Sequence, residues 1–312
     1  GAGGPGGLGG PGGTTGANGV DGVPAPPAVT VIDTNDSNPD YLAVTPDSRF
    51  VYGTSRIVGQ VFVIDAATNS VVATVPGVLD DPWAVAANPV KPYVYVAQPG
   101  YNAIQVIRTT DNTVVKTIGV GNEPSSIAVT PDGTVAYVAN AGSSGPSTIS
   151  VLDLSSNSVL TTWARPASTL ALGLNGVVWT LRASTVSRLD PTDGSVLSTA
   201  TDPGANSLAV SPLTGYAYVT NSLGRVDVFD TAGSLVSNIP VGDQPTTVTF
   251  GSDGTAYVAN SGSLTVSVID PDGNVVDVST GLRPRGLAVN PAENRLYIAN
   301  SQGIATVWWY AL

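Results

Sequence analysis

Acidic side chains in a few irregular loops are the first residues whose type could do chemistry. Asp80, Asp81, Glu123 and Asp243 offer carboxylate oxygens, which are the ligands that hard cations such as Ca²⁺ prefer. Their spacing matches no dedicated acidic metal-binding loop. We therefore interpret them as a solvated acidic rim and predict no bound metal and no other cofactor.

Arginines and aromatic residues in similar loops are suited to recognition. Arg283 and Arg285 flank a proline and could clamp a carboxylate or phosphate, although such a pair is more often simply a surface feature. Trp83 and Tyr101 stand among polar residues, as the anchors of protein contacts often do. The candidate binding face consists of Asp80, Asp81, Trp83, Gln98, Tyr101, Asn102, Glu123, Asp243, Arg283 and Arg285. The same connections also contain Asn122, Arg165, Arg182 and Gln244.

The composition restricts the functions that these residues can serve. The chain contains neither Cys nor His, so it lacks thiolate chemistry and the commonest general base. We therefore expect no enzyme activity, and a hydrolase or lyase that depends on carboxylates and a cation is the remaining enzymatic alternative. A net charge of −11 predicts no nucleic-acid partner. The apolar runs are too short for a membrane helix, so we expect no membrane insertion by this fragment.

The elements that must position these loops repeat along the chain. The clearest unit spans 127–140, with the sequence IAVTPDGTVAYVAN. Weaker copies begin near Leu42, Val85, Leu170, Leu208, Val248 and Leu287. A period near 40 residues in strand-forming sequence is typical of a β-propeller. Function in such a scaffold is expected where the copies differ, whereas recurring residues are expected to be structural.

The two ends of the repeat region predict how the ring closes. Each repeat offers four short strands, but the seventh has only three before Leu312, and the segment 28–33 is a spare strand before the first repeat. We predict an all-β, seven-bladed β-propeller of four-stranded antiparallel blades, closed by an N-terminal strand that completes the last blade. An open solenoid of seven units is the alternative.

The first 27 residues form a separate Gly/Pro-rich segment, and the predicted propeller spans 28–312. So many glycines are typical of a flexible tail, and the end of a longer Gly-rich domain is the alternative. The chain does not begin with Met, so we expect a processed product or a piece of a longer protein, with any targeting signal upstream.

Two recurring motifs resemble the YVTN family of β-propeller repeats. An aromatic-Val-(Ala/Thr)-Asn strand stands at 137–140, 218–221, 257–260 and 297–300, and a Val-x-Val-Ile-Asp strand stands at 61–65, 149–153 and 266–270. The fourth repeat departs most, because Val178-Trp179-Thr180-Leu181 replaces the first motif. The Gly-rich head resembles the Gly-rich sequences of mycobacterial PE_PGRS proteins. Together these resemblances imply a secreted or cell-envelope protein.

The recurring polar residues of these motifs have a structural interpretation. We expect the amides of Asn140, Asn221, Asn260 and Asn300, with Gln98 in the same position, to bond the backbone of a turn. A ring of amides around the channel mouth is the alternative. We also expect a group of aspartates, each at a strand end before a turn, to cap that turn, namely Asp65, Asp153, Asp190, Asp230 and Asp270.

We therefore expect a monomeric, surface-exposed or secreted interaction module, without catalytic residues, that binds a host or cell-envelope protein through the candidate face. Binding of a glycan or peptide in the central channel is the alternative function.

Overall fold

The computed structural model describes residues 29–34, 39–143, 145–300 and 304–309, and their regular structure is almost entirely β. The described part contains 28 strands and two short 3₁₀ helices, η1 (Pro99–Tyr101) and η2 (Leu174–Gly176). The predicted tail at 1–27 lies outside the described residues. The strands form four-stranded antiparallel sheets throughout, so the predicted propeller of four-stranded antiparallel blades is confirmed.

Six blades, rather than seven, are each made of four consecutive strands. The first three are β2 (Tyr41–Val44), β3 (Phe50–Ser55), β4 (Gln60–Asp65) and β5 (Ser70–Thr74); β6 (Val85–Ala87), β7 (Tyr93–Gln98), β8 (Ala103–Arg108) and β9 (Thr113–Gly119); and β10 (Pro124–Val129), β11 (Val135–Asn140), β12 (Thr148–Asp153) and β13 (Ser158–Trp163). The next three are β14 (Thr169–Leu172), β15 (Val178–Arg182), β16 (Thr185–Leu189) and β17 (Val196–Thr201); β18 (Ala205–Val210), β19 (Ala217–Asn221), β20 (Arg225–Phe229) and β21 (Leu235–Pro240); and β22 (Pro245–Phe250), β23 (Ala256–Asn260), β24 (Thr265–Ile269) and β25 (Val275–Ser279).

The remaining sheet combines both ends of the described chain. It consists of β26 (Pro284–Asn290), β27 (Arg295–Asn300), β28 (Ile304–Trp309) and β1 (Val29–Asp33), in that order. β1 pairs antiparallel with β28, in a register that places Val31 opposite Thr306. The strand that precedes the first repeat therefore lies at the outer edge of the sheet formed by the last repeat.

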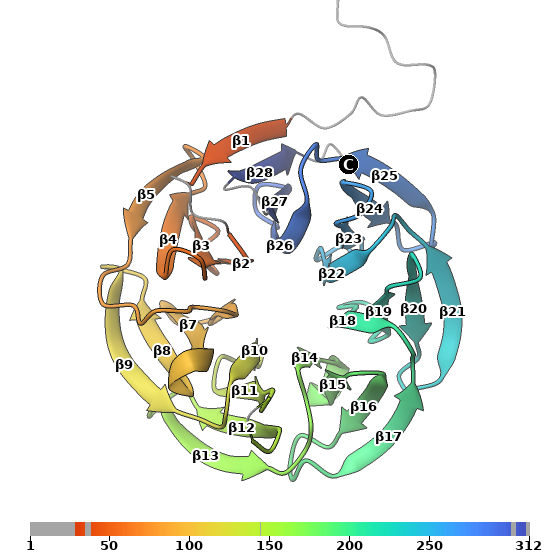
Figure 1. The fold of residues 1–312 in the computed structure, drawn as a ribbon, viewed down its shortest axis with the longest axis horizontal. Coiled ribbons are helices and arrows are strands. Elements are labelled where there is room, and N and C mark those ends of the chain that lie inside the picture. The colour runs from red at the N-terminus through yellow and green to blue at the C-terminus, as the bar shows by residue number, and fades with distance from the viewer. Residues whose placement is uncertain (1–28, 35–38, 144, 301–303, 310–312) are drawn as a thin grey trace, which may run out of the picture.

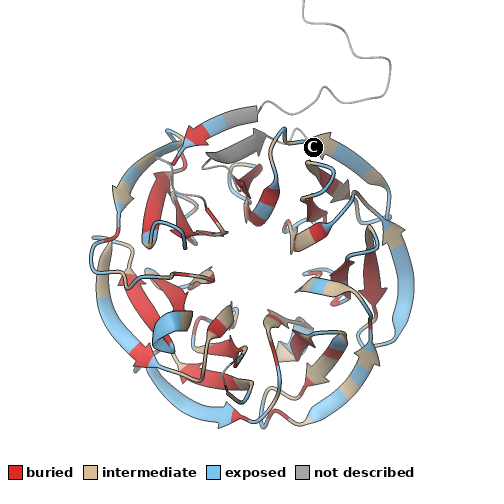
Figure 2. Ribbon diagram, in the orientation of Figure 1, coloured by how far each residue is buried: buried red, intermediate tan, exposed pale blue. Residues whose placement is uncertain are grey.

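The sheets stand around a central opening, with the first strand of each blade innermost and the last outermost (Figure 1). The apolar residues occupy consecutive strand positions because both faces of a blade are covered by its neighbours. One core cluster, for example, joins Tyr95 and Ile104 of the β6–β9 blade to Val138 and Leu152 of the β10–β13 blade. Among the strands, the outermost ones carry most of the exposed residues, as Figure 2 shows.

The turns between third and fourth strands confirm the predicted role of the recurring aspartates. At Asp65, for example, Oδ1 accepts hydrogen bonds from the backbone N–H groups of Ala67 and Thr68. Equivalent backbone bonds are made by Asp153, Asp190, Asp230 and Asp270. Hydrogen bonds from Ser156 and Ser155 lower the pKa of Asp153 to about 2. These residues are caps of the scaffold and do not belong to a site.

Candidate functional site

One face of the ring carries two pockets. In an antiparallel four-stranded blade, the connection that enters the first strand and the turn that follows the second strand lie at the same end. The structure places a pocket of about 440 Å³ on this face, lined by Asp40, Arg56, Ile57, Trp83 and Arg285. We call it the mouth pocket. A second pocket of about 250 Å³ belongs to the β14–β17 blade, and we call it the blade pocket.

The mouth pocket is assembled from three neighbouring blades. Asp40 precedes β2, Trp83 precedes β6 and Arg285 lies in β26, and β2 contacts both β6 and β26. The backbone of Trp83 is fixed across the blade boundary, because its N–H donates to the Ala97 carbonyl at 2.8 Å and its carbonyl accepts from Thr54 Oγ1 at 2.6 Å. The indole is thus held by the scaffold at the rim of the ring.

Two arginines line the pocket together with the indole, and each is paired with a carboxylate. Arg56 stacks 4.8 Å from the Trp83 ring centroid and its Nε lies 2.9 Å from Asp81 Oδ1. Arg285 Nη1 lies 2.9 Å from Asp40 Oδ1. The arginine side chains are 52% and 54% exposed, whereas that of Asp40 is 11% exposed. A guanidinium has five N–H donors, so both arginines keep donors that face solvent.

Aromatic and aliphatic surface completes this site. The rings of Tyr41 and Trp83 lie 5.7 Å apart and are tilted by 48°. Burial, and then the nearby Asp40 carboxylate, raise the pKa of the Tyr41 hydroxyl, so it stays a neutral hydrogen-bonding group. Ile57 is 74% exposed in the turn after β3. A large exposed aliphatic side chain beside a tryptophan and two arginines matches the composition of protein-binding hot spots.

Three of the ten predicted site residues meet here, namely Asp81, Trp83 and Arg285. Asp80 is exposed beside them, with its Oδ1 close to Gly59. Tyr101 is 50% exposed in η1. The preceding residue, Gly100, faces the Asp81 carboxylate.

The other predicted residues are placed elsewhere. Gln98 is fully buried and donates to Gln105 Oε1 at 2.8 Å, so a surface ligand cannot reach it. Asn102 and Glu123 belong to a loop network, because Asn102 Oδ1 accepts from the Glu123 N–H and the Glu123 carboxylate accepts from Ser143. Asp243 and Arg283 are exposed, and neither lines the mouth pocket.

Arg56, Ile57 and Asp40 were missing from the candidate face. Arg56 and Ile57 follow the second strand of their repeat and Asp40 enters the first, so the rule that selected the other loops would also have found them. The described residues contain no group of three or more acidic side chains that could hold a metal ion. The carboxylates of Asp80, Asp81, Glu123 and Asp243 are thus not brought together there. Within the described ranges no helix is long and apolar enough to cross a membrane.

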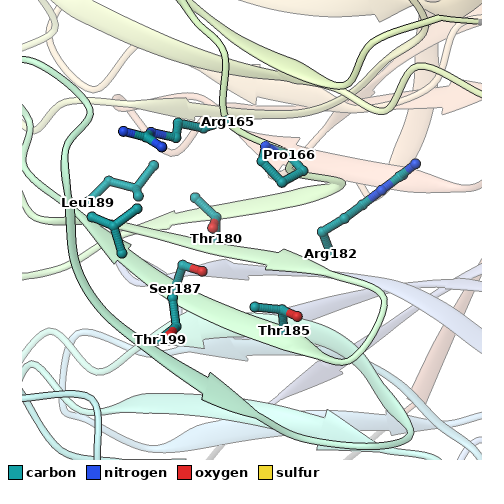
Figure 3. A pocket seen from close by; sticks show the side chains of 9 residues that line it. Arg165, Pro166, Thr180, Arg182, Thr185, Ser187, Leu189 and Thr199 are labelled. Carbon is teal, nitrogen blue, oxygen red and sulfur yellow. The ribbon is translucent and has the colours of Figure 1, made fainter.

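The blade pocket has a different chemistry (Figure 3). Arg165 and Arg182 stand at opposite sides of it, and the hydroxyls of Thr180, Thr185 and Ser187 lie between them. Leu189, Val196 and Pro166 supply apolar wall. This pocket lies in the fourth repeat, where the sequence departs most from its siblings.

A buried carboxylate pair marks the next blade, β18–β21. Asp202 and Asp227 are 4% and 1% exposed, and Asn221 Nδ2 donates to both, at 2.6 and 2.9 Å. Burial, and then the Asp227 charge, raise the pKa of Asp202 to about 6. Burial opposes ionisation of Asp227 too, but hydrogen bonds from Arg225 and Asn238 outweigh it and lower its pKa. Neither aspartate of this pair belongs to the candidate binding face predicted from the sequence.

Comparison with known proteins supports the fold. No protein-family model and no curated protein matches the chain. Among solved structures, a chain of Kuenenia stuttgartiensis hydrazine synthase is similar, with a TM-score of 0.80 and 21% sequence identity over 94% of this chain and 99% of that chain. At this identity the match shows a shared propeller fold alone.

This match corrects one expectation from the sequence. We expected no enzyme activity, but a chain of hydrazine synthase, an enzyme, has the same fold. The propeller scaffold is therefore no ground for excluding catalysis. The resemblance to YVTN and PE_PGRS proteins stays a prediction, because no family model matches.

Proposed function

We propose that this propeller is a binding module that docks a protein partner on the mouth pocket. The observation that carries the proposal is a pocket of about 440 Å³ in which Arg56 stacks on Trp83, with Arg285 and exposed Ile57 in the same lining. Trp and Arg are the residues most enriched among energetic hot spots. Because the scaffold holds the Trp83 backbone, little conformational entropy is lost when a partner binds.

The charges of the mouth pocket indicate the chemistry of the partner. Arg56 and Arg285 are each neutralised by an aspartate, so the free charge at the rim is the exposed Asp80 carboxylate. With a chain charge of −11, the face attracts basic rather than acidic surfaces. We therefore propose a partner that presents an apolar side chain to Ile57 and Trp83 and a basic side chain to Asp80.

The test is a pull-down from cell-envelope and host-cell extracts with the wild-type chain and with Trp83→Ala and Ile57→Asp. Truncating a hot-spot residue costs 2 kcal/mol or more, so we expect affinity to fall by roughly 30-fold and the specific proteins to be lost. Ile57→Asp changes a side chain that lies outside the core, so its effect is independent of any unfolding caused by Trp83→Ala.

Leu160→Ala is the matched control, because Leu160 is 60% exposed on the outer strand β13, away from the mouth pocket. The proposal requires that this variant recover the same proteins as wild type. Equal recovery by Trp83→Ala, Ile57→Asp and Leu160→Ala would place the binding surface elsewhere.

We also propose that the chain forms a closed, seven-bladed ring of the YVTN type. Pairing of β1 with β28 and burial of Ile32 against Ala288 and Tyr297 support this. Removing residues 1–33 would expose the edge of β28 and empty the Ile32 position, at a cost of at least about 3 kcal/mol. Removing residues 1–27 is the control. Equal stability of the two truncated chains, measured by urea unfolding, would contradict closure.

Secretion or display at the cell envelope is proposed from the resemblance of the Gly-rich head to PE_PGRS proteins. Fractionation of cells that express the full-length gene, followed by detection of the propeller in envelope, medium and cytosol, tests it. Recovery in the cytosol alone would contradict it.

A further inference from the structure

A buried asparagine ties the second strand to the third in two blades. Asn140 Nδ2 donates to Thr148 Oγ1 and Ser150 Oγ, both at 3.0 Å. In the β22–β25 blade, Asn260 Nδ2 donates to Thr265 Oγ1 at 3.1 Å and Ser267 Oγ at 2.8 Å. Both asparagines are fully buried. We call this pattern of one amide and two hydroxyls the amide clasp.

The β14–β17 blade keeps the two hydroxyls of the clasp and lacks the amide. Arg182 pairs with Thr185 as Asn140 pairs with Thr148. Ser187 occupies the position of Ser150, and its cross-strand partner is Thr180, where the β10–β13 blade has Val138. Relative to the β10–β13 blade, this blade surface therefore gains a hydroxyl at Thr180 and exchanges a neutral amide for a charged guanidinium at Arg182.

The blade pocket occupies the space that the missing amide leaves. Arg182 extends away from the strand, while Thr185 and Ser187 line the pocket (Figure 3). Thr180, Ser187 and Thr199 are direct cross-strand neighbours on β15, β16 and β17. None of these hydroxyls makes a side-chain hydrogen bond to the part of the chain that the structure describes.

The covering loop also differs from that of the other blades. In the clasped blades a glycine passes over the asparagine, since a Cβ on Gly121 would lie 2.6 Å from Asn140 Nδ2 and one on Gly242 would lie 2.8 Å from Asn260 Nδ2. The loop before β14 has no glycine and contains Arg165 and Pro166. The pocket is therefore left open to a ligand.

The pocket is cationic on an acidic protein. Its lining includes Arg165 and Arg182 and no carboxylate, whereas the whole chain carries a net charge of −11. Arg165 Nε donates to the Gly194 carbonyl at 2.9 Å. Arg182 forms no side-chain hydrogen bond or ion pair with the described residues. An unpaired guanidinium beside unengaged hydroxyls selects an anion that also carries hydroxyl groups.

We propose that the blade pocket binds a sugar acid, with its carboxylate on Arg182 and its ring hydroxyls on Thr180, Thr185 and Ser187. Serine and threonine hydroxyls both donate and accept, as sugar hydroxyls do. Val196, which is 45% exposed, offers apolar surface to the ring carbons. The pocket volume of about 250 Å³ suits a single sugar ring, because it lies just below the range of drug-sized sites. This site is formed by the β14–β17 blade and the loop that enters it, and none of its lining residues lines the mouth pocket.

Titration calorimetry of the full chain with sodium D-glucuronate, D-glucose and inorganic phosphate tests the proposal. We expect glucuronate to bind at least about tenfold more tightly than either of the other two, because only it engages both the guanidinium and the hydroxyls. Equal or tighter binding of phosphate would show a simple anion site and overturn the assignment. Tighter binding of glucose than of glucuronate would also overturn the proposal, because Arg182 would then not bind a carboxylate.

Arg182→Asn is the sharpest variant, because it removes the guanidinium and restores the asparagine that the repeat carries at this position. Glucuronate affinity is expected to fall at least about tenfold, and Thr180→Val, which restores the sibling valine, should lower it about fivefold. Arg49→Asn makes the same charge change at an exposed turn on the opposite face and should bind as wild type. Unchanged affinity in Arg182→Asn, with the thermal transition intact, would refute the site.

Discussion

The β10–β13 and β14–β17 blades are neighbours with the same strand pairing. At the end of the second strand, the first has a buried, bonded asparagine, whereas the second has a pocket. In the first, Asn140 is buried and bonded to Thr148 and Ser150. In the second, Arg182 stands at that position and a pocket opens over Thr185 and Ser187. A single position on the second strand thus decides whether the space between two blades is filled by the chain or available to a ligand.

The comparison also separates the architectural part of the repeat from the part that can vary. The clasp recurs at Asn140 and Asn260 with the same hydroxyl partners. In the β18–β21 blade the corresponding Asn221 instead bonds two carboxylates, Asp202 and Asp227. With Arg182 and the buried Gln98, which bonds Gln105, this one strand position accommodates four different polar arrangements.

The largest effect is expected from breaking the clasp where it is complete. Asn140→Ala removes two buried hydrogen bonds and leaves a small cavity between blades, so unfolding should become easier by about 3 kcal/mol. Urea unfolding measures this. The control Thr161→Ala changes an exposed residue of the outer strand β13 and should stay within about 0.5 kcal/mol of wild type. Similar losses in both would show that the clasp contributes little.

In the β18–β21 blade, where Asn221 bonds carboxylates, a substitution is expected to stabilise the fold rather than weaken it. The pKa of Asp202 is about 6 in the fold, above its unfolded value of about 3.8. The folded state therefore holds an extra proton between these values, and the contribution of Asp202 to stability falls as pH rises from 4 to 6. Asp202→Asn should remove this fall and stabilise the protein at pH 7 by about 2 kcal/mol.

The matched control for Asp202→Asn is Asp270→Asn. Hydrogen bonds from Asn274 lower the pKa of Asp270 in an exposed turn. Its stabilising contribution is thus present above the unfolded pKa and lost in acid, so this variant should weaken the fold at pH 7. Unfolding curves at pH 4.5 and 7 distinguish the two. A destabilised Asp202→Asn at pH 7 would mean that the buried pair is well satisfied when ionised.

Much of the fold can be predicted from the sequence, because each repeat carries the same pattern of strands and turns. The turn aspartates, the four strands per unit and the apolar residues on consecutive strand positions all depend on local pattern. The predicted bond from the recurring amide to a turn backbone is confirmed at Asn221, whose Oδ1 accepts from the Leu223 N–H. It is wrong for Asn140 and Asn260, which bond side-chain hydroxyls. Those hydroxyls come from the next strand, so they are found only when the strand register is known.

The candidate site was predictable only in part, for a related reason. Trp83 and Arg285 were chosen because their loops break the repeat, and the structure brings them to one pocket. Gln98 was chosen by the same rule, but it occupies the buried clasp position, which its alignment with Asn140 already indicated. The sequence shows that the fourth repeat is divergent. It does not show that Arg182 leaves a pocket, because this follows from the hydroxyl partners that Asn140 has at the same position of the preceding blade.

The smallest effect provides the finest test of the comparison. If Thr185 and Ser187 are placed as Thr148 and Ser150 are, Arg182→Asn should rebuild the clasp and raise the free energy of unfolding by about 1 kcal/mol, the net value of a new buried hydrogen-bonded group. Arg182→Ala removes the same guanidinium without supplying an amide and should stay within about 0.5 kcal/mol of wild type. The difference between the two variants in urea unfolding isolates the amide. Equal stability would mean that the hydroxyls of this blade are not arranged to receive it, and that the pocket has a cause other than the missing asparagine.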